Sequence, residues 1–188
     1  MIFCRSRKYI IYFLIVLCSL FNHPSFSFSQ VKINSNQLAF SKFEKEIFDL
    51  IESSMEPLKN MEEENLYNIT LLAEQKLAEG SLILAKLKIP PSLPDEIKTS
   101  LENVKVELLI GFRELEKSMN YLAKYIMYRN PFLYDKFIEK RDMGFLYIDG
   151  GLKSLTTVRL RLHAPERTIP DAWKVSKGRI YQIEKKTF

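Results

Sequence analysis

The chain has 188 residues, a net charge of +5 and only two cysteines. Both cysteines, Cys4 and Cys18, precede a predicted cleavage point after Ser29. A chain that begins at Gln30 has no cysteine, which excludes disulfides, thiolate metal sites and covalently attached haem. Its roughly 159 residues are enough for one domain with its own core.

Residues 1–29 are predicted to be a secretory signal peptide. Three basic residues at positions 5, 7 and 8 precede an uncharged apolar run at 9–21, and Ser27 and Ser29 supply the small residues of a cleavage site. The apolar run has 13 residues, whereas a membrane-spanning helix needs about 20. Cleavage and a periplasmic or secreted location are therefore favoured over a permanent anchor.

Two other fates of this segment stay open. An uncleaved leader would tether the same domain outside the membrane. A lipid on Cys18 is the second, but Leu17 is bulkier than the small residue that usually precedes a lipidated cysteine.

Apolar residues then recur at steps of three and four, a pattern that predicts α-helices. The predicted helices span about residues 38–57, 61–87, 95–129 and 132–162. Pro57 is expected to kink or end the first helix, because proline lacks the amide that a helix interior needs. Short, proline-marked turns favour an antiparallel up-down-up-down four-helix bundle over residues 30–163.

Residues 164–188 are predicted to form a basic tail outside the bundle. Pro165 and Pro170 interrupt the helical pattern, and the Ser-Lys-Gly sequence at 176–178 suggests the turn of a short hairpin or an extended tail. Residues 153–188 carry nine basic and three acidic side chains, whereas residues 30–152 carry 16 basic and 20 acidic ones. Outside the cell, anionic membranes or wall polymers are more plausible targets for such a tail than nucleic acid.

Catalytic and cofactor motifs are not recognisable in the sequence. His163 is the single histidine after Ser29 and is expected to be exposed at a helix end; a di-iron carboxylate bundle needs two. The acidic residues, such as Glu74, Glu102 and Glu116, fall at positions expected to face solvent. No catalytic residue, cofactor or metal is therefore predicted, and the protein is expected not to be an enzyme.

Glycines inside the predicted helices allow two interpretations. Gly150 and Gly151 follow Asp149 in the fourth helix, where each glycine costs about 1 kcal/mol relative to alanine. They predict either a notch for close helix packing or a break that exposes backbone to a ligand. Arg141 falls on the apolar seam of the same helix and must reach solvent or pair with an acidic residue.

Two groups of residues are candidates for binding. The aromatic group lies at the end of the third helix and just beyond the following turn, and it either plugs the bundle or forms an exposed patch: Tyr121, Tyr125, Tyr128 and Tyr134. The basic group, interleaved with tryptophan, either solubilises the tail or contacts an anionic surface: Arg159, Arg161, Trp173, Lys174, Lys177 and Arg179.

These features predict an exported, non-enzymatic helical bundle that acts as a binding or scaffold module in the cell envelope or extracellular space. A protein partner or self-association is expected. The alternative is a bundle that holds a small ligand in a cavity lined by Gly80, Gly111, Gly144 or Gly150. A hydrolase is a more distant alternative, and it would require two carboxylates converging in a cleft.

Overall fold

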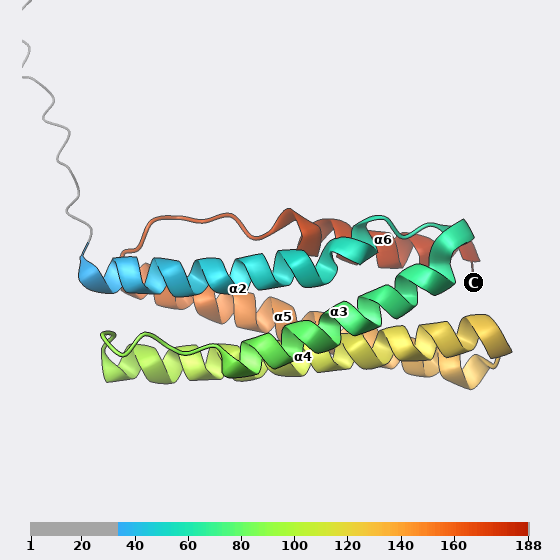
Figure 1. Cartoon of the computed structure of the whole chain (residues 1–188), viewed down its shortest axis with the longest axis horizontal. Helices are drawn as coiled ribbons and strands as arrows, with labels where there is room; N and C mark the ends of the chain where they lie inside the picture. Colours follow the sequence, from blue (N-terminus) through green and yellow to red (C-terminus); the bar gives the residue numbers. More distant parts are fainter. Residues whose placement is uncertain (1–33, 188) are drawn as a thin grey trace, which may run out of the picture. The chain divides into compact units, whose positions relative to one another are not determined.

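The computed structural model describes residues 34–187 (Figure 1). The predicted signal peptide, its cleavage point and Cys18 lie outside the described residues. Five α-helices and one short 3-10 helix make up the secondary structure of this part of the chain, and no strand occurs in it. None of these helices combines the length and the apolar character needed to cross a membrane.

The predicted all-α class is confirmed. The helices are α2 (Ser35–Lys59), η1 (Glu63–Asn65), α3 (Leu66–Lys86), α4 (Asp95–Tyr128), α5 (Pro131–Arg161) and α6 (Asp171–Thr187). Helices α2, α4 and α5 begin and end within about three residues of the predicted bounds, whereas α3 begins at Leu66 rather than at residue 61, because η1 precedes it. Pro57 stands inside α2, two residues before its end, so the helix stops close to where the proline was expected to stop it.

Local chemistry explains where these helices begin and end. The side chain of Asn34 accepts a hydrogen bond from the amide of Asn36, and the side chain of Gln37 accepts one from the amide of Asn34, which is a capping box. The side chain of Asn130 caps α5 by accepting a hydrogen bond from the amide of Phe132, ahead of a proline at the first helical position. Arg129 has a φ of 52°, and this left-handed residue ends α4.

Glycines bring α4 and α5 together. A Cβ atom added to Gly111 would lie 2.6 Å from Cγ1 of Ile148, and one added to Gly144 would lie 2.5 Å from Cγ of Leu115. Gly151 is equally close to α4. Along α4 the contacting residues are Leu108, Gly111 and Leu115, and their partners on α5 are Gly151, Ile148 and Gly144, so the numbers of the partners fall as those of α4 rise. The packing-notch interpretation therefore holds for Gly151.

Helix α3 packs against both α2 and α4. Gly80 lies where the three helices meet: an added Cβ would be 2.4 Å from Oγ of Ser54 in α2 and 2.7 Å from Cε1 of Phe112 in α4. Ala73, Leu77 and Leu84 lie on the same side of α3 and are buried. One face of α3 thus belongs to the common core.

The prediction of an extended or hairpin tail is wrong, because residues 171–187 form the helix α6. The buried residues of α6 follow helical spacing, and they are Ala172, Trp173, Ser176, Ile180 and Ile183. Gly178, which suggested a turn, lies inside the helix with no atom within 4 Å of an added Cβ. The basic residues alternate with this narrow apolar face, and that mixture hid the periodicity.

An irregular segment, residues 162–170, connects α5 to α6, and we call it the strap. Its second residue, His163, has a φ of 49°. The side-chain amide of Gln37 donates to the carbonyl oxygens of Leu162 and His163, both at 3.0 Å. At the far end, the amide of Ala172 donates to Oε2 of Glu52 at 3.1 Å. Helix α2 therefore holds both ends of the strap.

The glycine contacts predict opposite effects for two Gly→Ala substitutions. Gly144→Ala should lower the free energy of unfolding by about 1–3 kcal/mol, because its Cβ would overlap Leu115 and the Leu115 amide nitrogen, 3.0 Å away. Gly178→Ala should raise it by up to about 1 kcal/mol, since the site is open and alanine favours helix. Urea unfolding of both variants checks this, and a neutral Gly144→Ala would contradict the close approach.

Candidate interaction surfaces

Two of the predicted binding residues hold α6 against α5. The indole nitrogen of Trp173 donates to Oδ1 of Asp149 at 2.9 Å, and its ring meets Phe145 edge-on with centroids 5.5 Å apart. Lys177 donates to Oδ2 of Asp149 at 2.5 Å and lies 5.3 Å from the Phe145 ring centroid. The structure thus places Trp173 and Lys177 in a packing contact between helices.

The same seam continues to the predicted aromatic residues at the start of α5. Arg141 is buried and pairs with Glu184 of α6, and its guanidinium lies 4.6 Å from the Tyr181 ring centroid. The Tyr134 hydroxyl donates to Oε1 of Glu184 at 3.3 Å, and its ring lies 5.2 Å from that of Tyr125. Burial and the Glu184 charge raise the pKa of Tyr134, so its hydroxyl stays protonated and can donate. Of the two outcomes predicted for Arg141, the structure shows the pairing with an acidic residue.

Arg159 is not a surface cation but half of a buried ion pair. Its Nε and Nη2 atoms lie 2.8 and 2.7 Å from Oε1 of Glu44, a residue of α2 that is only 1% exposed. Its Nη1 donates to the carbonyl oxygen of Arg167 in the strap at 3.0 Å. The Arg167 side chain lies 3.5 Å from Oε2 of Glu44. Burial raises the pKa of Glu44, an effect that both arginines oppose.

The other predicted residues are distributed over separate surfaces. Arg161 is exposed and pairs with the exposed Glu96 at 3.1 Å. Lys174 and Arg179 are exposed on α6. Tyr121 is half-buried and packs against the core. The ten candidates therefore do not converge on one site.

The most exposed aromatic residues gather at the turn between α4 and α5. Tyr128 is 67% exposed, Phe132 61% and Met127 56%, and we call these three residues the aromatic tip. Two cations border it: Arg129 lies 5.8 Å from the Tyr125 ring centroid, and Lys136 lies 5.8 Å from that of Phe132. Met127 was missed by the sequence analysis, although it falls off the seam formed by its neighbours and its exposure could have been predicted.

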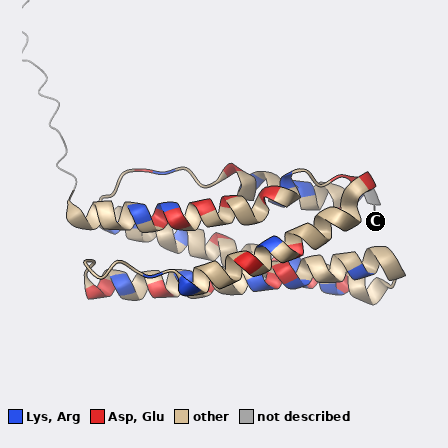
Figure 2. Ribbon diagram, viewed as in Figure 1, with Lys and Arg blue, Asp and Glu red and all other residues tan. Residues whose placement is uncertain are grey.

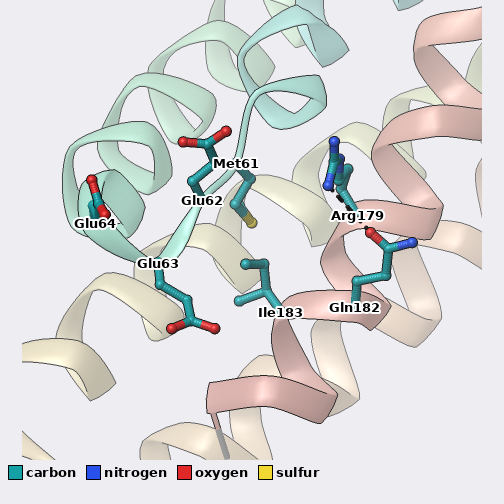
Figure 3. Close-up of a pocket in the computed structure, with 7 residues that line it drawn as sticks. All are labelled: Met61, Glu62, Glu63, Glu64, Arg179, Gln182 and Ile183. Atoms are coloured by element: carbon teal, nitrogen blue, oxygen red, sulfur yellow. Dashed lines mark hydrogen bonds between the residues drawn. The ribbon is translucent and has the colours of Figure 1, made fainter.

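A polar hollow of about 430 Å³ lies between the α2–α3 connection and α6 (Figure 3). Glu62, Glu63 and Glu64 come from the connection, and Arg179 and Gln182 from α6, with Met61 and Ile183 completing the lining. Figure 3 shows Arg179 hydrogen-bonded to Gln182, with Nη1 and Oε1 at 3.4 Å. The hollow is open and combines three carboxylates with one guanidinium.

Two of the acidic residues that were predicted to face solvent, Glu74 and Glu116, line one hollow. Glu74 and Glu116 are half-buried and line a second hollow, of about 260 Å³, with Asn120 donating to Oε1 of Glu74 at 2.7 Å. The expectation that both acids face open solvent is wrong for them but holds for Glu102. Burial and the charge of Glu74 raise the pKa of Glu116.

Within residues 34–187, no group of three or more metal-ligating side chains is close enough to hold an ion. His163 is exposed at the end of α5, as predicted. Comparisons of the chain with protein-family models, curated proteins and solved structures found no match. Its function must therefore be inferred from its own residues.

The buried ion pair predicts a large effect at one arginine and a small effect two positions away. Arg159→Leu should lower the free energy of unfolding at neutral pH by about 3–5 kcal/mol, because Glu44 loses its hydrogen-bonded partner while buried. Arg161→Leu is the matched control and should cost at most about 1 kcal/mol, since its ion pair is exposed. Denaturant unfolding of both variants measures the difference, and equal losses would contradict it.

The Arg159→Leu loss should also depend on pH. Arg159 lowers the pKa of Glu44, so its removal leaves Glu44 in the folded state with a pKa further above its value in the unfolded chain. A carboxyl group with a raised pKa in the folded state lowers the free energy of unfolding as pH rises through that pKa. The difference in the free energy of unfolding between Arg159→Leu and wild type should therefore shrink on acidification, when Glu44 is neutral in both the folded and the unfolded chain.

Proposed function

We propose that this protein is an exported, non-enzymatic binding or scaffold module that contacts a protein partner through its aromatic tip. In this proposal α2 to α5 form an antiparallel up-down-up-down bundle, and α6 is a fifth helix docked on it. The opposed numbering of the Gly111–Ile148 and Gly144–Leu115 contacts supports the antiparallel pairing of α4 with α5. The predicted signal peptide supports export.

The exposure of Tyr128, Phe132 and Met127 is the observation that carries the proposal. Protein interfaces are enriched in tyrosine, phenylalanine and methionine at their centres, and clustered exposed apolar residues often mark contact sites. The bordering Arg129 and Lys136 add the polar rim that such interfaces have. The tip sits on a tight turn between two long helices, so it is presented on a rigid support.

The filled glycine notches favour a scaffold over a carrier. A ligand cavity was expected to be lined by Gly80, Gly111, Gly144 or Gly150. Side-chain atoms lie within 2.4–2.6 Å of a Cβ built on the first three, which leaves no room beside them for a ligand. Gly150 is more open, with only Oε2 of Glu107 nearby, at 3.9 Å.

The basic residues give weaker support to a contact with an anionic polymer. Arg159 of α5 and Lys177 of α6 are engaged with Glu44 and Asp149, so fewer of the predicted basic residues remain available than the sequence suggested. A hydrolase is the more distant alternative, and the hollow lined by Glu74 and Glu116 is the feature that favours it. We therefore retain protein binding as the first choice.

Site-specific photo-cross-linking in the native host tests the tip. A photoreactive phenylalanine analogue at position 132 should give one adduct of defined mass, and adding Tyr128→Ser should weaken that adduct several-fold. The matched control carries the analogue at Leu146, which is 70% exposed on α5 but distant in sequence from the turn. The same pattern of adducts from both positions would refute a specific contact at the tip.

A further inference from the structure

Helix α3 has a second apolar face that points away from the core. Leu82 is 63% exposed and Ile83 56%, and Leu71 and Leu72 are each more than 40% exposed. Soluble helices usually show one apolar stripe, and a helix that is apolar on both sides is usually covered on both. The ribbon of α3 is mostly tan, with red and blue turns near its middle (Figure 2).

Two of these exposed residues, Leu71 and Leu82, lie in a row with the spacing of a helix-pairing seam. Leu71, Gln75, Ala78, Leu82 and Ala85 are separated by alternating steps of four and three. This is the heptad spacing that lets two helices pack side by side. The small Ala78 and Ala85 stand on either side of Leu82 and would allow close approach.

We infer that this outer face of α3 binds the same face of a second copy, with the two helices antiparallel about a two-fold axis near Ala78. In that register Leu71 faces Ala85 of the second copy, and Gln75 faces Leu82. A two-fold contact requires a surface to be complementary to itself. The α3 face meets this requirement because each large residue lies opposite a smaller or polar one.

The charges on this face obey the same symmetry. Lys76 pairs with Glu79, with Nζ and Oε2 2.7 Å apart, and Gln75 donates to the other carboxylate oxygen at 2.8 Å. Both ions lie within three residues of Ala78, so in this register Lys76 of one copy faces Gly80 of the other and comes within one residue of the level of its Glu79. A central charged pair of this kind fixes register between helices. Charge complementarity thus selects a second copy in the antiparallel orientation.

The size of the surface predicts a reversible dimer. Helix α3 has 21 residues, a length of about 31 Å at 1.5 Å per residue. Val106 of α4 is also exposed, and the contacts of Gly80 with Phe112 and of Glu74 with Asn120 place its turn of α4 beside the end of α3. A contact made by one face of α3 together with Val106 lies towards the lower end of the sizes of stable protein interfaces. The fraction of dimer should therefore change with protein concentration in the micromolar range.

Charge reversal tests the orientation. With the chain as its host processes it, sedimentation equilibrium should show a dimer that Lys76→Glu weakens at least ten-fold. Combining Lys76→Glu with Glu79→Lys should restore it, because opposite charges again face each other. Lys45→Glu is the matched control, since Lys45 pairs with Asp49 on the outside of α2 and is at least as exposed as Lys76. A monomer at every concentration would overturn the proposal, as would equal effects of Lys76→Glu and Lys45→Glu.

Cysteine cross-linking tests the axis independently of stability. In a background without Cys4 and Cys18, Ala78→Cys should form a disulfide-linked dimer on mild oxidation, because the axis passes beside it. Ala85→Cys alone should not, but a mixture of Ala85→Cys and Leu71→Cys chains should link to each other. Cross-linking of Ala85→Cys to itself would show a parallel or different pairing and refute the antiparallel register. None of these residues belongs to the aromatic tip. The experiments can therefore refute the dimer contact on α3 without bearing on the partner contact at the aromatic tip, and the reverse also holds.

Discussion

The buried charge pair between Glu44 and Arg159 is the constraint on which the C-terminal part of the structure depends. A guanidinium out of water costs several kcal/mol unless it is paired and hydrogen-bonded. Nε of Arg159 donates to Oε1 of Glu44, Nη2 lies 2.7 Å from the same oxygen without a hydrogen bond, and Nη1 donates to the carbonyl oxygen of Arg167. That last bond is the one that captures the strap, so satisfying a buried charge also determines the path of the chain after α5.

Polar groups of α2 then guide the chain towards α6. Gln37, Glu44 and Glu52 lie at intervals of seven and eight residues, which puts them on one side of the helix. Each holds a successive part of the strap or the first turn of α6. Glu52 also places a negative charge at the positive end of the α6 dipole. Helix α6 is in this way delivered to α2 and α5, where its aromatic contacts form.

The sequence predicted the elements whose signals are local. The Pro94, Pro131 and Pro57 positions, together with uninterrupted apolar steps, located α2 to α5 within a few residues. Helix α6 was missed because its buried face is narrow and includes Ser176, which is buried by a hydrogen bond to the carbonyl oxygen of Met55. The contacts of α6 with α2, such as Ser176 with Met55, join residues more than 100 positions apart, and helical periodicity does not report tertiary contacts of this kind.

The candidate binding residues show the same limit. Tyr128 and Trp173 look alike in sequence as aromatic residues near basic ones, yet one is mostly exposed and the other is 3% exposed. What separates them is Asp149, whose carboxylate accepts from both Trp173 and Lys177. Composition predicts that a residue could bind, but only the three-dimensional partners decide whether it is already occupied within its own chain.

The burial of Trp173 has a practical consequence, because it is the single tryptophan of the chain. Its indole is enclosed beside Phe145 and hydrogen-bonded to a carboxylate. Intrinsic fluorescence excited at the indole band therefore originates from one location, the junction of α5 and α6. Detachment of α6 would expose the ring to water and shift its emission to the red, while the rest of the helices stayed spectroscopically silent. The protein thus carries its own optical probe for the docking of its last helix.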